Sequence, residues 1–364
     1  MVVMPTGIHR HPVVFVASQG SVYAIKELPR MLAQREYEVL RRLEDRTMAA
    51  ARPVGLVDRE WLESDSEQSG AVITAFVRHA FPYRHLLTGA GFAGRRDQMV
   101  DAIAGLLVEL HLARCFWGDC SLSNVLCRFD AGSIEAIMID AETSEIFESI
   151  SDGRRQEDLE IMKENIAGAM SDIAAQDGTT VVEADFEMGF EVENRYHSLW
   201  EALNDEVVIR SDEGFRVRQH IARVNELGFW VGDVELEPTG DGDRVSLRVG
   251  VGGRTFHIQR LRELTGIEAS ENQSRLILND LNTSIAKSKA ETPQIVAVSE
   301  WQISTFLPTI EWIGNHWSGS DPIQGFCDFL LHRRSMAADR GRDVANQEAL
   351  DSWAQSGFPG FPSS

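Results

Sequence analysis

The chain has few cysteines, and their spacing is not that of a metal site. Three of the four lie within thirteen residues without forming a C-x-x-C pair, and no metal-ligand histidines lie between them; the four are Cys115, Cys120, Cys127 and Cys327. A disulfide-stabilised secreted domain is therefore excluded. We expect four free thiols in a reducing cytoplasm, with Cys115, Cys120 and Cys127 buried.

Long apolar runs are also absent. The longest apolar stretch, residues 102–112, is interrupted by Glu109 and His111, and it is too short and too polar to cross a bilayer. The first seven residues have no basic region followed by an apolar core, so no signal peptide is expected. With 43% hydrophobic and 25% charged residues, the composition is that of a folded soluble protein. We expect a cytoplasmic protein without a transmembrane segment.

Positive charge is scarce in the second part of the chain. Residues 1–130 hold 15 basic and 15 acidic residues, so the whole net charge of −21 lies after residue 130. Nucleic acids and anionic membranes are poor partners for so acidic a region. A helix over 214–228 followed by a hairpin has the order of a winged helix, but this charge argues against DNA binding. The same surplus favours a neutral or basic substrate.

Lysine is rare as well. Only four of the 35 basic residues are lysines, and Lys26 alone lies in an apolar strand pattern, at 22–28. Because the chain otherwise uses arginine, a lysine at this position indicates a chemical role.

The hydrophobic pattern predicts a small antiparallel sheet with one helix, then a mainly helical region with an inserted hairpin. The first part has strands at 13–17, 22–28, 54–57 and 71–77, helices at 29–46, 95–112 and 155–175, and the hairpin at 125–128 and 134–139. After residue 178 we expect helices at 184–205, 214–228, 258–265, 272–290 and 299–315, with a hairpin at 231–238 and 244–251. The tail after Trp353 is expected to be loosely held.

The residues that indicate chemistry surround one short loop. Asp119 and Asn124 lie five residues apart at opposite ends of a loop that leads into a strand, and the next strand delivers Asp140 beside them. Such a group supplies oxygen ligands for Mg²⁺ and a base for an acceptor hydroxyl, while Lys26 supplies a cation for phosphates. The expected partner of Lys26 is Glu36, which shares the buried face of its helix.

Each of these features also has a plain structural explanation. Ala-Ile-Lys-Glu alone is an ordinary edge strand, Asp119 and Asn124 alone suit a turn with a side-chain cap, and Asp140 alone suits a turn. Glu38 is a weaker alternative to Glu36. The order of all five residues, with the lysine and glutamate upstream, favours a phosphotransferase.

At these residues the chain resembles the protein-kinase-like superfamily. Its lysine strand, its Asp and Asn five residues apart and its later Asp are similar to the kinase motifs, and the Gly118-Asp119 pair is similar to that of aminoglycoside, choline and lipopolysaccharide kinases. Residues 6–11, 24–29 and 35–37 resemble a bacterial group of actinobacterial type, related to lipopolysaccharide (Kdo) kinases, with an uncharacterised C-terminal domain. Residues 332–333 and 341–344 resemble the end of that domain.

The resemblance implies ATP and Mg²⁺ as cofactors and a role for each residue. Lys26 holds the α- and β-phosphates and is oriented by Glu36, and Asp119 acts on the acceptor hydroxyl. The remaining residues bind cofactors: Asn124 and Asp140 hold the metal with Glu142 as an extra ligand, adenine meets the backbone from Ala75 to Val77, and Gly7 lies in the phosphate turn. The acceptor, a small molecule, a lipid or a protein, stays unidentified.

The chain departs from the kinase pattern before Lys26, where no G-x-G-x-x-G occurs. The corresponding turn has one glycine, Gly7, and the basic or imidazole side chains of residues 9–11, which are candidates for phosphate contacts. We expect His9 and His11 to face solvent. The degenerate loop keeps open an alternative function, a nucleotide-binding pseudokinase that serves as a partner-binding or regulatory module.

The sequence therefore predicts an α+β, bilobal protein-kinase-like fold with an additional α-rich C-terminal domain. Residues 1–80 form the N-lobe and residues 81–177 form the C-lobe with the catalytic loop. No Gly-, Ser- or Pro-rich linker occurs near residue 178. We therefore expect residues 178–364 to pack directly on the kinase module.

Overall fold

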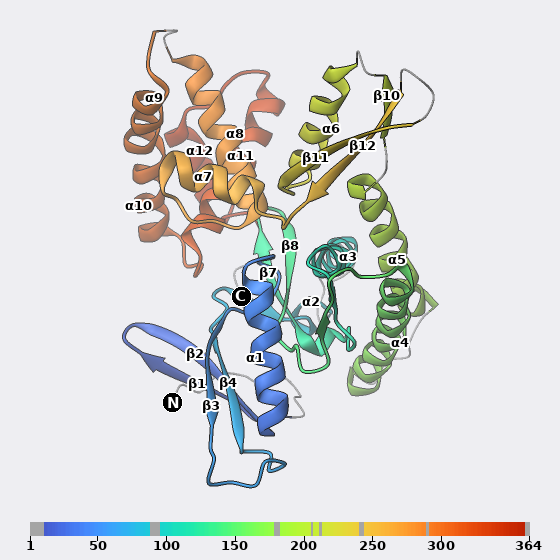
Figure 1. The fold of residues 1–364 in the computed structure, drawn as a ribbon. Helices are drawn as coiled ribbons and strands as arrows, with labels where there is room; N and C mark the ends of the chain where they lie inside the picture. The colour runs from blue at the N-terminus through green and yellow to red at the C-terminus, as the bar shows by residue number, and fades with distance from the viewer. Residues whose placement is uncertain are drawn as a thin grey trace. The chain divides into compact units, whose positions relative to one another are not determined.

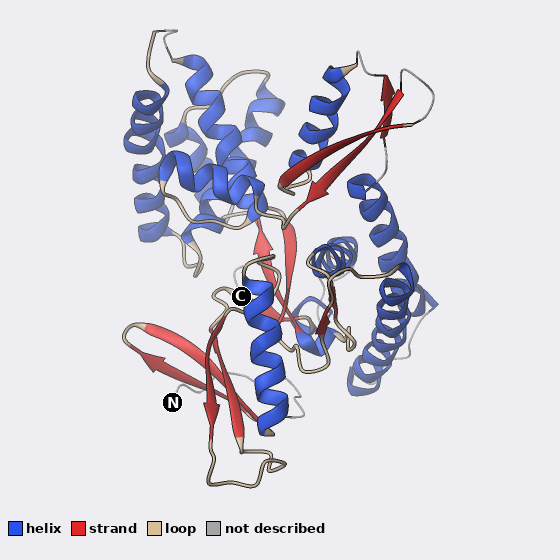
Figure 2. Ribbon diagram, in the orientation of Figure 1, coloured by secondary structure: helices blue, strands red, loops and turns tan. Residues whose placement is uncertain are grey.

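The structure, a computed structural model, describes residues 11–87, 95–177, 183–204, 207–210, 213–239, 244–288 and 291–360 (Figure 1). The chain divides into two compact units. Unit 1 comprises Met1–Arg128 and Ile134–Arg254, and unit 2 comprises Phe129–Ser133 and Thr255–Ser364. Figure 2 shows strands throughout the first part of the chain and only helices after β12, so the expected α+β class with an α-rich C-terminal region is confirmed.

The first sheet of unit 1 has four antiparallel strands in the order β1-β2-β4-β3. They are β1 (Val13–Ser18), β2 (Ser21–Leu28), β3 (Pro53–Asp58) and β4 (Gly70–Ala75). The β1–β2 hairpin turns at Gln19 and Gly20. Their φ angles of 50° and 79° suit a two-residue type I′ turn, in which both central residues have positive φ. Helix α1 (Arg30–Glu44) begins after Pro29 and packs its apolar face on β3 and β4. The sequence predicts the bounds of these elements to within two residues.

A mainly helical region follows in unit 1. It contains the short elements β5 (Ala80–Pro82), α2 (Arg84–Leu87), β6 (Cys115–Phe116), η1 (Leu122–Asn124) and β9 (Glu145–Ile146), and the inserted hairpin β7 (Val125–Asp130) and β8 (Ser133–Met138). Strands β5, β7 and β8 form one sheet, and β6 pairs with β9. The long helices are α3 (Arg96–Leu112), α4 (Asp152–Asp177) and α5 (Glu183–Asn204). Helix α5 packs against both α3 and α4 (Figure 1), so α3 is buried nearly all round.

The end of unit 1 is a helix with a three-stranded sheet. The helix is α6 (Gly214–Glu226), and the strands, in the order β10-β12-β11, are β10 (Val207–Arg210), β11 (Val231–Pro238) and β12 (Arg244–Val251). The expected helix and hairpin are confirmed, and β10 is an addition. Because unit 1 extends to Arg254, the structural division falls later than the expected domain boundary at residue 177.

Unit 2 is a helical bundle around an aromatic core. Its helices are α7 (Phe256–Thr265), α8 (Glu271–Lys287), α9 (Gln294–Trp301), a π-helical turn (Gln302–Phe306), α10 (Leu307–His316), α11 (Pro322–Arg340) and α12 (Asn346–Gln355). The largest buried side chains include Trp301, Phe326 and Trp353. The expectation of a loose tail is wrong for residues 354–360, because the Phe358 ring packs edge-on against Trp353 and the Trp353 indole donates a hydrogen bond to the Pro359 carbonyl, at 2.8 Å.

The tip of the β7–β8 hairpin, Phe129–Ser133, belongs to unit 2, whereas the rest of the hairpin belongs to unit 1. The Asp130 carboxylate accepts hydrogen bonds from the backbone N–H groups of Asn272 (3.0 Å) and Gln273 (2.7 Å), at the start of α8. The Ala131 N–H donates to the Gln324 side chain, at 3.0 Å. Asp130 is 1% exposed, so a buried carboxylate from a distant part of the sequence caps this helix.

Candidate active site

Lys26 lies in the middle of the first sheet, on β2, with Val13 of β1 and Val72 of β4 as its register partners. Its Nζ atom is 3.1 Å from Oε2 of Glu36, which lies on α1 and is 1% exposed. Glu38, the weaker alternative, instead accepts a hydrogen bond from Gln34 on the exposed side of the helix. The structure therefore places the one lysine of the apolar strand against the buried glutamate of α1.

Two more carboxylates contact the same ammonium. Asp140 Oδ2 is 2.7 Å and Glu142 Oε2 is 3.6 Å from Lys26 Nζ. The two acidic residues are also joined to each other, because the Glu142 N–H donates to Asp140 Oδ1 at 3.1 Å. Lys26, Glu36, Asp140 and Glu142 thus form one cluster, although they are up to 116 residues apart in the sequence.

The charges of this cluster depend on burial and on mutual attraction. Burial lowers the pKa of Lys26, but the carboxylates of Glu36 and Asp140 outweigh it, so the pKa is raised and the ammonium stays charged. Burial raises the pKa of Glu36 to about 7, against the attraction of Lys26. The site therefore holds a persistent cation surrounded by carboxylates.

The loop residues Asp119 and Asn124 are in direct contact. The Asn124 amide donates to Asp119 Oδ2 at 3.0 Å, across the turn formed by η1. The other oxygen, Oδ1, accepts a hydrogen bond from the Asn165 amide of α4 at 3.2 Å. Asp119 is thus held by two amide donors. Asn165 was missed by sequence reasoning, and no local motif distinguishes it.

A second residue that sequence reasoning missed, Asp158 of α4, fixes the backbone of the loop. It accepts hydrogen bonds from the backbone N–H groups of Trp117 (2.7 Å) and Gly118 (2.8 Å), and its side chain is fully buried. Its signal in the sequence is an aspartate on the apolar face of a helix, four residues before the buried Met162. Gly118 has a φ of 78° and its backbone passes close to Thr143, so this turn requires glycine.

The expectation that His11 faces solvent is wrong. His11 is 3% exposed, and its ring lies between two carboxylates, with Nδ1 2.9 Å from Glu67 and Nε2 3.3 Å from Glu142. A short-range pattern cannot reveal these partners, because both lie far along the chain. Gly7 and His9 lie outside the described residues.

The expected adenine segment begins at the last residue of β4. The Ala75 N–H donates to the Arg52 carbonyl at 2.9 Å, and the Phe76 N–H donates to the Val22 carbonyl at 3.0 Å. Neither of these two N–H groups is therefore left for a base that docks here. The placement from Ala75 to Val77 stays a prediction.

The expected metal ligands offer a donor set that fits Mg²⁺. Asp140 and Glu142 supply carboxylate oxygens, Asn124 supplies an amide oxygen, and this hard cation prefers oxygen ligands. Asn124 already orients its amide nitrogen toward Asp119, which leaves its amide oxygen for another partner. Among the described residues, no group of three or more His, Cys, Asp and Glu side chains has the arrangement of a metal site.

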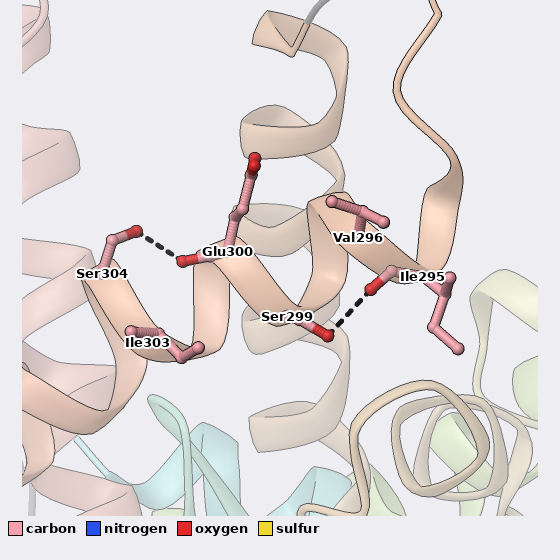
Figure 3. A pocket seen from close by; sticks show the side chains of 6 residues that line it. All are labelled: Ile295, Val296, Ser299, Glu300, Ile303 and Ser304. Atoms are coloured by element: carbon pink, nitrogen blue, oxygen red, sulfur yellow. Dashed lines mark hydrogen bonds between the residues drawn. The ribbon is translucent and has the colours of Figure 1, made fainter.

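Other features of the chain lie apart from this cluster. All four cysteines are free, as expected, and Cys327 is buried like the three for which burial was expected. Burial raises the pKa of Cys115 and of Cys127 to about 12. No helix within the described ranges is long and apolar enough to span a membrane. A shallow pocket on α9 and the π-helical turn is lined by residues between Ile295 and Ser304 (Figure 3), and none of the expected site residues belongs to it.

Two family models match the chain in succession. Residues 19–185 match the lipopolysaccharide kinase (Kdo/WaaP) family, and residues 198–357 match a domain of unknown function, DUF4032. A solved structure described as WaaP in complex with acyl carrier protein is similar at 15% identity and a TM-score of 0.37, covering 61% of this chain and 87% of that chain. No curated protein matches the chain. The resemblance to a kinase-like group with an uncharacterised C-terminal domain is confirmed.

Proposed function

With the lipopolysaccharide kinase match over residues 19–185 as the premise, we propose that this protein transfers the γ-phosphoryl group of ATP to a hydroxyl group, with Mg²⁺. The acceptor oxygen would form the new bond to phosphorus while the bond to the ADP oxygen breaks. The acceptor proton would pass to Asp119. The acceptor is an unidentified small molecule, lipid or protein, and four free thiols support a cytoplasmic location.

The contact of Lys26 with three carboxylates is the observation that carries this proposal. One cation among Glu36, Asp140 and Glu142 leaves an excess of negative charge, which Mg²⁺ on a nucleotide would offset. The ammonium would then bind the α- and β-phosphates, with Glu36 still holding it in place. Asn124, Asp140 and Glu142 would bind the metal, which would neutralise charge on the phosphates.

The second candidate is a nucleotide-binding pseudokinase that serves as a partner-binding or regulatory module. The absence of a glycine-rich sequence before Lys26 favours it, because few backbone N–H groups would then enclose the phosphates. Both candidates require nucleotide binding, and only the kinase requires phosphoryl transfer.

Ligand-dependent stability tests the shared requirement. Mg-ATP should raise the melting temperature, since a ligand at a hundred times its Kd stabilises the folded state by about 2.7 kcal/mol. Lys26→Ala should remove most of this shift, whereas Lys163→Ala, at a lysine outside the cluster, should keep it. A folded protein that shows no shift at millimolar Mg-ATP would contradict the nucleotide site.

Labelled ATP separates the two candidates. Single-turnover reactions with γ-labelled ATP, first alone and then with fractionated metabolites, lipids and proteins, should yield labelled phosphate or a labelled product. A Mg-ATP melting shift without any transfer would favour the pseudokinase.

A further inference from the structure

A chain of polar groups crosses the interior of unit 1 and ends at the loop that carries Asp119. The Arg155 guanidinium donates a hydrogen bond to the Tyr196 hydroxyl at 3.0 Å, and this hydroxyl is 2.8 Å from His111 Nδ1. His111 Nε2 is 3.1 Å from Asp158, the residue that accepts the N–H groups of Trp117 and Gly118. The side chains of His111 and Asp158 are fully buried, and Tyr196 is 0% exposed.

The direction of each hydrogen bond follows from chemistry. Burial lowers the pKa of His111, so the ring is neutral and has one N–H and one acceptor nitrogen. The Asp158 carboxylate can only accept, so Nε2 carries the proton and Nδ1 must accept from the Tyr196 hydroxyl. Burial raises the pKa of Tyr196 to about 12, which keeps that hydroxyl protonated. The donors therefore run in one direction from Arg155 to Asp158, and the Asp158 carboxylate also accepts the N–H groups of the loop from the other side.

We propose that Tyr196 is a positioning residue for the catalytic loop, acting through His111 and Asp158. Its hydroxyl fixes the tautomer and the orientation of the His111 ring. The ring then fixes the carboxylate that accepts hydrogen bonds from the N–H groups of Trp117 and Gly118. Asp119 is the next residue, so a small rotation of Asp158 would displace the group proposed to meet the acceptor.

Neither of the two family matches covers Tyr196. Tyr196 lies on α5, after the kinase-family match ends at residue 185 and before the second match begins at residue 198. Neither match assigns it a role. Helix α5 would then supply a part of the active-site support, and would not serve only as a covering helix.

A purely packing role for Tyr196 is the competing explanation. Its ring stacks on Trp200, with centroids 5.8 Å apart, and the Arg155 guanidinium lies 3.9 Å from the centre of the Trp200 ring. Tyr196→Phe keeps this ring stack and removes only the hydroxyl. Ser198→Ala is a matched control, because it removes an exposed hydroxyl of the same helix that bonds only to the Asn194 carbonyl.

Amide hydrogen exchange in the full chain tests the link without assuming any activity. Tyr196→Phe should speed exchange at Trp117 and Gly118 by about tenfold beyond any change in the rest of unit 1, and Ser198→Ala should not. Exchange that changes equally in all of unit 1 would overturn the proposal. Nitrogen NMR of wild-type His111 is a second test that needs no variant, because a proton on Nδ1 instead of Nε2 would also overturn it.

Turnover is the readout that rests on the proposed function. Tyr196→Phe should lower kcat by about tenfold and change the KM for ATP much less, because Lys26 lies outside this chain of hydrogen bonds and the Trp117 indole donates to the Asp140 carbonyl, not to its carboxylate. An unchanged kcat would overturn the positioning role. If wild-type protein transfers no phosphate, the proposed function fails, and the exchange and NMR experiments still decide whether Tyr196 holds the loop.

Discussion

The two aspartates of the site make different contacts, and these predict different effects of substitution. Asp119 contacts two amide donors, Asn124 and Asn165, whereas Asp140 contacts the Lys26 ammonium. Asp119→Asn should keep Mg-ATP binding and lower turnover by about a hundredfold or more, since a general base is removed. Asp140→Asn should instead weaken the magnesium-dependent part of ATP binding. Calorimetric titration and single-turnover kinetics measure the two effects.

Asp172→Asn provides the control for this pair, because it removes one carboxylate from an exposed position of α4. This substitution should change neither the magnesium-dependent ATP binding nor the turnover. Full turnover of Asp119→Asn on an identified acceptor would contradict the role of Asp119. Magnesium-dependent binding that survives Asp140→Asn would contradict the role of Asp140.

The carboxyl group of Glu109 should make the free energy of unfolding depend on pH. Burial raises its pKa to about 7, and the Thr47 hydroxyl donates a hydrogen bond to it at 2.9 Å. Because the folded state holds this proton more tightly than the unfolded state, Glu109 contributes stability that is present below pH 4.5 and is lost as the pH rises to 7. The loss is up to about 3 kcal/mol. Glu109→Gln should flatten the fall between these pH values, as measured by urea unfolding at each pH.

The comparison with wild type is needed because His111 acts in the opposite direction. Burial lowers its pKa, so its contribution rises with pH. This contribution is common to both proteins and cancels in the difference. A wild-type and a variant profile that stay parallel from pH 4.5 to pH 7 would show that Glu109 does not titrate in this range.

At the scale of residues, chain order alone brings Lys26, Asp119 and Asp140 to attention, and the structure places them in two contacting groups. The sequence cannot identify Asp158 or Asn165 in the same way. Their roles depend on how α4 packs under the loop, which is a tertiary property. Buried polar residues on apolar helix faces are the one signal that sequence reasoning could have used.

At the scale of elements, two glycines in the packed helices α4 and α5 predict opposite effects of alanine. A Cβ at Gly168 of α4 would meet nothing within 4 Å, so Gly168→Ala should raise the free energy of unfolding by about 0.4 to 1 kcal/mol. A Cβ at Gly189 of α5 would lie 3.0 Å from the backbone of Lys163 on α4. Gly189→Ala should therefore push the helices apart and cost about 1 kcal/mol or more, despite the better helix propensity.

Chemical denaturation of the two variants measures both effects, and each serves as the control for the other. If Gly189→Ala stabilises the protein as much as Gly168→Ala, the close approach of α4 and α5 is not a feature of the protein in solution.

Long elements with a clear hydrophobic period are predicted well. The elements discussed next were missed for physical reasons. Helix α11 escapes the pattern because polar residues occupy buried positions: Gln324 is 4% exposed and Asp328 is 3% exposed. Strand β10 has only four residues, which is too short for a period. The helix expected at 299–315 begins earlier and contains a π-helical turn, a widening that a period of 3.6 residues cannot reveal.

At the scale of the whole molecule, the packing of α5 indicates where the chain can be shortened without loss of folding. Met188, Val192 and Tyr196 of α5 are fully buried, in a helix that packs on α3 and α4. A chain ending at Asp177 should expose the apolar faces of those helices, and so aggregate or lose cooperative unfolding. A chain ending at Arg254 keeps α5 and should melt cooperatively and bind Mg-ATP. Light scattering and calorimetry distinguish the two.

A soluble chain ending at Asp177, with a cooperative melt and unchanged Mg-ATP binding, would contradict the dependence on α5. Loss of Mg-ATP binding from the chain ending at Arg254 would contradict the expectation that a chain with α5 keeps the site. The sequence predicts that an additional domain follows the kinase part, but its boundary depends on contacts of α5 that no local pattern contains.

The capping of α8 by Asp130 has a consequence for how such chains can recombine. Unit 2 is not one continuous stretch of the gene, because its first five residues, Phe129–Ser133, are encoded more than 120 codons before the rest. A crossover that exchanged only residues 255–364 between two related chains would pair one parent's hairpin tip with the other parent's α8. The tip and the helix N-terminus must therefore be inherited together or change in step, and a chimera should carry both pieces from the same parent.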